Sequence, residues 1–347
     1  MKHILVIRMS AMGDVAMTVP IIRTLVQQNL DVRVTVVSRP FFKPFFDDIE
    51  RVDFFGVDLK NRHKGFLGIY KLYQALKKLH IDYVADLHNV LRSKILRSFF
   101  KISGTQVAFT DKGRADKKAL TRAENKVFRP VKSMIDRHLD TFSQLGFQID
   151  LSKNKFPSKK LIPHKVIDLV GEKHNVCWIG IAPFAQYDTK VYPQDLMAKT
   201  IALLSSNKSN RILLFGGGTA EIDKLHKLQQ NFENVTVVAG ILNFEQELHL
   251  IQNLDVMLSM DSGNGHIAAM YGVPVVTLWG QTHPYAGFVP FNQPLTNSLT
   301  PNLDQYPLIP TSVYGNKIIP GYADAMRTID PRQVVLKINE SLQQLFR

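Results

Sequence analysis

An aspartate and a glycine follow the first apolar run of the sequence, in the segment Arg8-Met9-Ser10-Ala11-Met12-Gly13-Asp14. Residues 3–7 before it predict a buried strand, and the residues up to about Gln28 predict a helix. Asp14 therefore stands behind the carboxyl end of a strand, where α/β domains bind their ligands. A carboxylate in this place can take a proton from a sugar hydroxyl, or it can complement the dipole of the helix that begins there. Position alone leaves both interpretations open.

A second polar loop follows the apolar run that ends at Met260 and reads Asp261-Ser262-Gly263-Asn264-Gly265-His266. Its two glycines lack Cβ atoms, so a ligand can approach the backbone N–H groups of a helix start, which favours a diphosphate. Asp261 can accept hydrogen bonds from sugar hydroxyls, and His266 can donate toward a phosphate. The alternative is an aspartate that caps a helix and a histidine exposed to solvent.

Two further loops carry a charge after a predicted strand. Residues 182–193 contain Lys190, a point charge suited to phosphate, although a lone lysine in a loop is usually solvated. Residues 215–221 contain three consecutive glycines and then Glu221, which could hold ribose hydroxyls. The alternative for the second loop is a tight glycine turn capped by Thr219.

Two common nucleotide motifs are missing from the sequence. The turn after residues 3–7 lacks G-x-G-x-x-G, which a dinucleotide-dependent oxidoreductase would need there, and no G-x-x-x-x-G-K-[ST] occurs anywhere. No D-x-D-like carboxylate cluster accompanies the loop at Asp261, so we expect an enzyme that works without a metal and without a cofactor. A nucleotide-dependent oxidoreductase remains only as a weaker alternative.

The elements that position these loops form two series of alternating strands and helices. The first series has predicted strands at residues 32–38, 52–57, 83–87 and 106–109, and the second at residues 176–182, 211–215, 235–238, 256–260 and 273–278. The polar, proline-containing stretch 151–164 predicts a linker. We therefore expect an α/β protein with an acceptor-binding domain at 1–160, a donor-binding domain at 161–330, and a helix at 331–347 for which packing on the first domain is considered.

Taken together, these loops resemble the ADP-heptose:lipopolysaccharide heptosyltransferase family (glycosyltransferase family 9). Ser10-x-Met12-Gly13-Asp14 with Pro20 resembles its opening S-x-x-G-D-x-x-x-x-x-P, and Asp261-Ser262-Gly263-x-x-His266 resembles its D-[ST]-G-x-x-H signature. Downstream, G-x-P at 272–274 and G-x-T-x-P at 280–284 continue the match, and Lys190 fits the K-x-W-P motif with Tyr192 in place of the tryptophan.

The resemblance implies the GT-B fold, two facing Rossmann-like domains with a cleft between them. It implies an inverting transfer of a heptose or related sugar from an ADP-sugar to the lipopolysaccharide inner core; another nucleotide-sugar-dependent GT-B transferase is the alternative. Asp14 would be the catalytic base. The donor residues it implies are Lys190, Glu221, Leu242, Asp261, Ser262, Gly263 and His266; the acceptor residues are Ser10, Gly13, Lys60, Arg62, Lys64 and Arg92.

Positive charge is confined to one half of the chain. Residues 1–160 hold 30 Lys and Arg against 15 Asp and Glu, whereas residues 161–347 hold 13 against 15. A basic first domain suits an anionic partner, and we expect a lipid-linked saccharide and the membrane surface rather than nucleic acid. The short apolar start, the single Cys177 and the lack of a spanning run predict a cytoplasmic protein, peripheral on the inner membrane.

Overall fold

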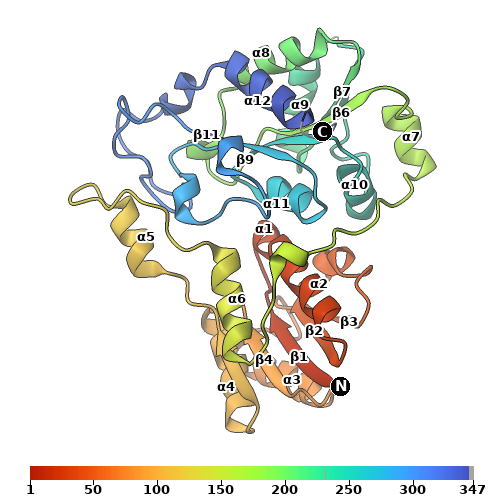
Figure 1. Cartoon of the computed structure of the whole chain (residues 1–347), viewed down its shortest axis with the longest axis vertical. Helices are drawn as coiled ribbons and strands as arrows, with labels where there is room; N and C mark the ends of the chain where they lie inside the picture. Colours follow the sequence, from red (N-terminus) through yellow and green to blue (C-terminus); the bar gives the residue numbers. More distant parts are fainter. Residues whose placement is uncertain (231, 344–347) are drawn as a thin grey trace. The chain divides into compact units, whose positions relative to one another are not determined.

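Two parallel sheets organise the chain in the computed structural model, which describes residues 1–230 and 232–343 (Figure 1). The first structural unit comprises Met1–Arg114 and Lys132–Pro157, and the second comprises Ala115–Val131 and the chain from Ser158 onward. The boundary at Pro157 and Ser158 lies inside the stretch predicted as a linker.

The sheet of the first unit has five strands in the order β3-β2-β1-β4-β5, and all its neighbours pair in parallel. The strand order reverses between β1 and β4, so the loops that follow these two strands meet at the carboxyl edge of the sheet, where open α/β sheets bind ligands. The strands are β1 (Lys2–Ile7), β2 (Val32–Ser38), β3 (Val52–Gly56), β4 (Tyr83–Asp86) and β5 (Gln106–Phe109).

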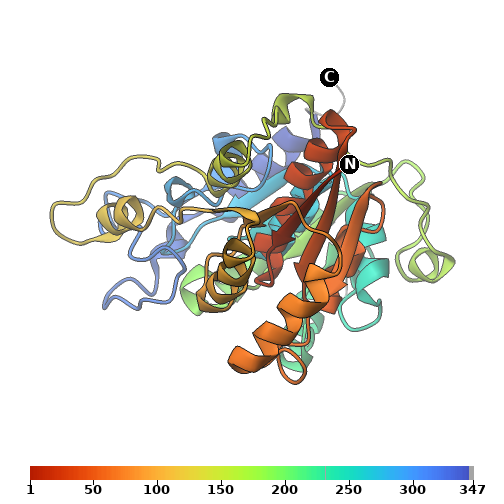
Figure 2. The ribbon, with the colours of Figure 1, turned by 90° about the horizontal axis from the view of Figure 1, so that it is seen from below.

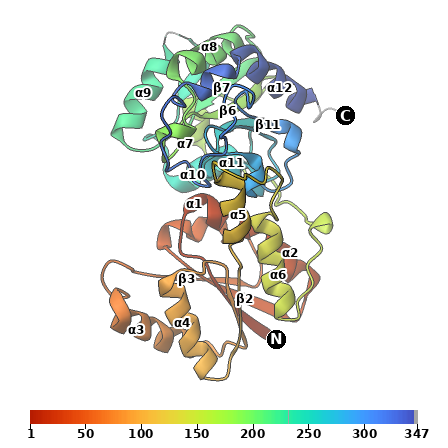
Figure 3. The same cartoon turned by 90° about the vertical axis from the view of Figure 1, so that its left-hand side faces the viewer.

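Helices cover both faces of this sheet (Figure 3). One face carries a core in which Leu5 and Ile7 of β1 pack with residues of α3 and α4, and the other face is covered by α2 and α6. Alternate residues of β1 are buried on both faces, as the continuous apolar run predicts. The helices are α1 (Met12–Ala16), α2 (Thr18–Gln28), α3 (Gly65–Lys77), α4 (Leu91–Ile102) and α6 (Met134–Gln144).

The sheet of the second unit has six parallel strands in the order β11-β10-β9-β6-β7-β8. Its reversal lies between β6 and β9, whose following loops hold Lys190 and Asp261. The strands are β6 (Cys177–Ala182), β7 (Asn210–Leu214), β8 (Val235–Val237), β9 (Val256–Met260), β10 (Val275–Leu278) and β11 (Ser298–Leu299).

The helices of the second unit include the one at the carboxyl end of the described chain. Val334 and Ile338 of α12 belong to the core of this unit, and α12 packs on α8, β9 and β10. The predicted carboxyl-terminal helix, with its possible packing on the first domain, corresponds to α12. It belongs to the second unit, because its apolar stripe completes that core. The helices are α7 (His164–Val170), α8 (Gln194–Ser205), α9 (Thr219–Gln229), α10 (Phe244–Ile251), α11 (Gly263–Met270) and α12 (Pro331–Gln343).

One segment expected in the first domain belongs to the second unit. Residues 115–131, with most of α5 (Arg114–Thr121), group with the second unit, although the predicted first domain ran without interruption from 1 to 160. The Nζ atom of Lys126 donates to the carbonyls of Leu308 and Pro310, at 2.6 and 3.1 Å. The Val131 amide donates to the carbonyl of Tyr285 at 3.0 Å. These hydrogen bonds join residues far apart in sequence. Local sequence patterns therefore do not reveal that residues 115–131 belong to the second unit.

Candidate active site

Asp14 lies in the first turn of α1, directly behind the carboxyl end of β1. Its Oδ2 atom pairs with the guanidinium of Arg8 and accepts a hydrogen bond from the Ala11 amide at 3.2 Å. Arg8 is 5% exposed, and its Nη1 atom also donates to the carbonyl of Leu87 at 2.6 Å. The Asp14 carboxylate thus complements the dipole at the start of α1, one of the two interpretations that the sequence left open. It is also fixed by the buried Arg8, which joins the loops after β1 and β4.

The surroundings of Asp14 are cationic. Burial lowers the pKa of His88 to about 3, and the charges of Arg8 and Lys112 act in the same direction while Asp14 opposes them. Burial also lowers the pKa of Lys112, again with Arg8 adding to the effect and Asp14 opposing it. His88 is therefore neutral near pH 7, and the cations close to Asp14 are Arg8 and Lys112. This part of the edge can therefore hold an anion beside the carboxylate.

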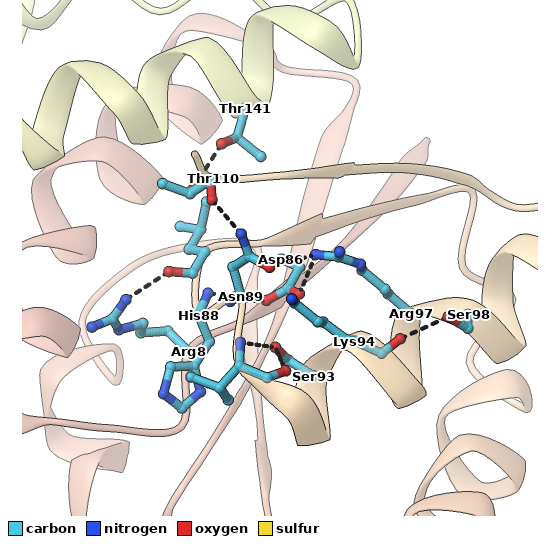
Figure 4. A network of polar contacts seen from close by, with 12 residues as sticks. Arg8, Asp86, His88, Asn89, Ser93, Lys94, Arg97, Ser98, Thr110 and Thr141 are labelled. Atoms are coloured by element: carbon cyan, nitrogen blue, oxygen red, sulfur yellow. Dashed lines mark hydrogen bonds and ion pairs between the residues drawn. The ribbon is translucent and has the colours of Figure 1, made fainter. Parts of the chain in front are cut away.

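A buried aspartate fixes the loop after β4, from which His88 extends (Figure 4). The carboxylate of Asp86 accepts from the amides of His88 and Asn89, at 3.0 and 2.8 Å, and pairs with Arg97 of α4 at 2.8 Å. Asn89 in turn donates to the carbonyl of Thr110 at 2.8 Å. Because Asp86 is fully buried and its charge is compensated, it supports the loop rather than binding a ligand.

The predicted acceptor residues all lie in the first unit, in three separate segments. Ser10 and Gly13 share the turn with Asp14, and the Ser10 hydroxyl lies 3.5 Å from Nε2 of His88. The predicted basic residues are exposed: Lys60, Arg62 and Lys64 lie in the loop after β3, and Arg92 lies in the first turn of α4.

The predicted donor residues all lie in the second unit, and two of them, Lys190 and Asp261, meet behind β6 and β9. The ammonium of Lys190 donates to the carbonyl of Asp261 at 2.6 Å and lies 3.3 Å from its carboxylate. The hydroxyl of Thr282 donates to the same carboxylate at 2.9 Å. The side chains of Lys190 and Asp261 are only 12% and 10% exposed, so neither the solvated lysine nor the simple helix cap describes them.

The loop that carries Lys190 is held from two sides. The amide of Gln281 donates to the carbonyl of Thr189 at 2.9 Å, and the Thr189 hydroxyl donates to the carbonyl of Gly315. A Cβ atom on Gly280 would lie 2.1 Å from the Thr189 oxygen, so only glycine permits this approach. Gly280 and Thr282, which the sequence showed as motif residues without a role, thus position Lys190 and Asp261.

The loop after β9 leads directly into α11. Ser262 is the residue before the helix, and its hydroxyl lies 3.2 Å from that of Ser259. His266 is 7% exposed, so the alternative of a histidine exposed to solvent is wrong. A Cβ atom on Gly265 would lie 3.3 Å from Oγ of Ser259, so this glycine permits close packing of helix on sheet, and ligand access at Gly265 stays a prediction. The N–H groups of the first turn, which begins at Gly263, remain suited to an anion.

Glu221 and Leu242 follow the two outer strands β7 and β8. The carboxylate of Glu221 accepts from the amide of Gly217 at 2.8 Å, across a turn in which Gly218 has a φ of 78°. Thr219 is the first residue of α9 and makes no cap, so the carboxylate itself stabilises this turn. Leu242 is 7% exposed. The structure places both near the carboxyl edge of the sheet, and their contact with a nucleotide stays a prediction.

Sequence reasoning missed several residues of the site: Arg8, His88 and Lys112 around Asp14, and Thr189 beside Lys190. Arg8 stands at the end of β1, and a charge at the end of a buried strand was the available signal. Among the described residues, no group of three or more His, Cys, Asp or Glu side chains is arranged to hold a metal ion. Metal independence remains a prediction.

The sequence model of glycosyltransferase family 9 (heptosyltransferase) matches residues 69–317. A Haemophilus influenzae protein described as lipopolysaccharide core heptosyltransferase OpsX is 23% identical over 82% of this chain and 80% of its own length. Lipopolysaccharide heptosyltransferase 3 of Escherichia coli K12 is 23% identical over 78% of this chain and 80% of its own.

Solved structures share the architecture at low sequence identity. A family 9 glycosyltransferase from Veillonella parvula superposes with a TM-score of 0.76 at 17% identity, over 99% of this chain and 98% of its own. Heptosyltransferase II of Escherichia coli superposes with a TM-score of 0.68 at 18% identity over the full length of both chains. The two parallel α/β domains therefore form a GT-B fold, and the chain belongs to glycosyltransferase family 9, the heptosyltransferases.

Proposed function

We propose that the chain transfers a heptose or related sugar from an ADP-sugar to the inner core of lipopolysaccharide, with inversion at the anomeric carbon. Relatives over most of the chain are described as lipopolysaccharide heptosyltransferases. An Escherichia coli heptosyltransferase of the same fold was solved with ADP and with ADP-2-deoxy-2-fluoro heptose. The observation that carries the proposal is the pairing of Lys190 with Asp261 at the start of α11.

In the proposed reaction the second unit holds the donor. Lys190 and the N–H groups at the start of α11 bind the diphosphate, and His266 lies within the same helix turn. The Asp261 carboxylate, fixed by Thr282, binds hydroxyls of the donor sugar. As the bond between the anomeric carbon and the diphosphate oxygen breaks, ADP leaves with the electron pair, and fixed positive groups stabilise the growing charge.

The first unit supplies the base and binds the acceptor. Asp14 takes the proton of the acceptor hydroxyl while that oxygen forms its bond to the anomeric carbon on the face opposite the leaving ADP. A positioned base typically contributes a factor of about 10² to 10⁴. The ammonium of Lys112, close to Asp14, suits an acid group of the acceptor, and Lys60, Arg62, Lys64 and Arg92 suit more distant phosphates.

The chain is proposed to work without a metal, at the cytoplasmic face of the inner membrane as a peripheral protein. Lys190 and the helix amides would take the place of a divalent ion at the diphosphate. The part of the chain that the structure describes has no helix long and apolar enough to cross a membrane. The strongly basic first half suits an anionic surface.

A panel of nucleotide sugars, each incubated with a lipid-free inner-core saccharide, tests the proposal. We expect ADP-heptose to give product whose new linkage has inverted anomeric configuration, and chelator treatment to leave the rate unchanged. Retention of configuration, or transfer from another nucleotide sugar alone, would refute the proposed donor or mechanism. Mass spectrometry of co-purified nucleotide separates the alternatives, since an oxidoreductase would carry a dinucleotide.

A further inference from the structure

Helix α3 carries apolar side chains on two opposite faces. Ile69, Leu72 and Leu76 are buried against the first sheet, as expected for a surface helix. On the opposite face Phe66, Leu67 and Tyr70 are 61%, 73% and 43% exposed. A surface helix normally presents polar residues there, so this second apolar stripe needs a partner.

Helix α4 extends the same surface. The two helices pack on each other, and Figure 2 shows them adjacent. Phe99 of α4 lies between the exposed residues of α3, with ring centroids 5.7 Å from Phe66 and 5.5 Å from Tyr70. Leu91, the first residue of α4, is 74% exposed. We call the exposed side of these two helices the α3–α4 face.

Apart from Asp58, whose carboxylate is bonded to amides of the loop, the segments that form this face have no negative charge. Residues 59–81 contain six Lys and Arg, and residues 87–110 contain four, without a single Asp or Glu in either segment. Exposed apolar residues among cations are typical of surfaces that bind anionic lipids, where the apolar side chains enter the interface and the cations meet the headgroups. Nucleic acid would also bind to cations and stack on aromatic rings, but the exposed side chains of Leu67 and Leu91 contribute nothing to such binding.

The basic loop before α3 is fixed next to the apolar stripe. The Asp58 carboxylate accepts from the amides of Lys60, Asn61 and Arg62, at 3.2, 3.0 and 3.2 Å. A Cβ atom on Gly68 would lie 2.4 Å from the carbonyl carbon of His63, so the loop is packed closely on the helix. The cations of this loop therefore have a defined place beside the start of α3.

Both helices begin at the carboxyl edge of the first sheet, the edge that also carries Asp14. A membrane bound around the starts of α3 and α4 would thus bring lipid-anchored molecules to the edge with the proposed base. We propose that the α3–α4 face binds an anionic phospholipid bilayer, with Phe66, Leu67 and Tyr70 entering the interface and Lys60, Arg62 and Lys64 contacting headgroups. This inference rests on the proposed function for its purpose, but its test does not need activity.

The two native tryptophans permit a direct test on the full chain, because Trp178 and Trp279 are 0% and 1% exposed in the second unit. A Leu67→Trp variant adds an exposed reporter. We expect its emission to shift to shorter wavelength with vesicles containing about a third phosphatidylglycerol, and not with pure phosphatidylcholine. Leu161→Trp is the control, since Leu161 is 93% exposed beside Lys159 and Lys160 in the second unit. It should show no shift.

Binding to the same anionic vesicles should weaken by about tenfold or more in Phe66→Glu/Leu67→Glu, while Leu161→Glu binds as the unchanged protein does. Equal binding of all three, or a Leu67→Trp shift with duplex DNA but not with vesicles, would overturn the inference. Transfer to the lipid-free acceptor should be the same in the double variant. Wild-type protein that fails to transfer at all would refute the proposed function and leave the vesicle result standing.

Discussion

The guanidinium of Arg8 binds the Asp14 carboxylate and, through its other terminal nitrogen, the carbonyl of Leu87. The loops after β1 and β4 are thereby joined at the point where the strand order of the first sheet reverses. A carboxylate on a short helix of five residues would otherwise have several rotamers. Arg8 is thus a positioning residue for the proposed base.

Replacement of Arg8 by methionine should lower kcat by about ten- to a hundredfold, because the base loses its fixed orientation. Asp14→Asn should lower kcat by about a hundredfold or more, with little change in ADP affinity. The double variant should be no slower than Asp14→Asn alone, since Arg8 acts through the aspartate. Steady-state kinetics of the three variants checks this. Additive losses would mean that Arg8 contributes independently, and an Asp14→Asn rate within threefold of the unchanged enzyme would exclude Asp14 as the base.

Substitutions of Lys190 and Thr282 should distinguish contacts to the donor diphosphate from contacts to the donor sugar. Lys190→Ala should weaken binding of ADP itself, by about tenfold. Thr282→Val should raise the KM for the ADP-sugar and leave ADP affinity unchanged, because it frees only the Asp261 carboxylate. Calorimetry with ADP and kinetics with the donor measure the two effects.

A matched control for this cluster is Arg327→Ala, which removes an exposed ion pair of the same unit, 3.0 Å from Asp195. Exposed ion pairs of this kind contribute little to stability, so neither the ADP affinity nor the KM for the ADP-sugar should change. Unchanged ADP affinity in Lys190→Ala would contradict its assignment to the diphosphate.

His88 should make folding stability depend on pH. Its pKa is lowered from 6.5 to about 3, first by burial, so the unfolded chain binds a proton below pH 6.5 that the folded chain does not. Stability is therefore fully present above pH 6.5 and is lost as the pH falls toward 3, by at most about 1.4 kcal/mol per pH unit. His88→Gln should lose less stability between pH 7 and pH 5 than the unchanged protein, as urea unfolding at the two values will show. Identical losses would mean that His88 is protonated in the folded chain.

The strands were predictable wherever β-branched and apolar residues run without interruption. The predicted ranges 32–38, 106–109 and 256–260 agree with β2, β5 and β9. The two-residue strand β11 escaped notice because so short a segment carries no periodicity. Both loops with glycine and aspartate were also found, because their residue types are unusual directly behind a buried strand.

Long-range relations were not predictable in the same way. The Arg8–Asp14 pair is local, but its anchor on Leu87 depends on the pairing of β1 with β4, which aligns Ile7 with Asp86. The segment 115–131 is mostly polar, and its contacts lie far away in sequence. Residue types indicate what each loop can bind, whereas only the strand order shows which loops share an edge.

Gly280 gives the sharpest steric test of the donor site. A methyl group there would lie 2.1 Å from the Thr189 carbonyl oxygen and 2.8 Å from Cα of Lys190. Both contacts are with backbone, so the loop must move and the Lys190 ammonium with it. Gly280→Ala should therefore weaken ADP binding about as much as Lys190→Ala does. It should also lower the melting temperature, which Lys190→Ala should affect less.

The effects of Gly280→Ala and Lys190→Ala on ADP affinity should not be additive. Gly280→Ala displaces the Lys190 ammonium, which Lys190→Ala removes. Calorimetry with ADP on both single variants and on the double variant measures this, with thermal unfolding of each as the check on folding. ADP affinity in a folded Gly280→Ala protein equal to that of the unchanged protein would show that the loop accommodates the methyl group and that Lys190 does not depend on this close approach. A double variant that binds ADP much more weakly than Lys190→Ala would instead show that the loop at Gly280 contacts the nucleotide by itself.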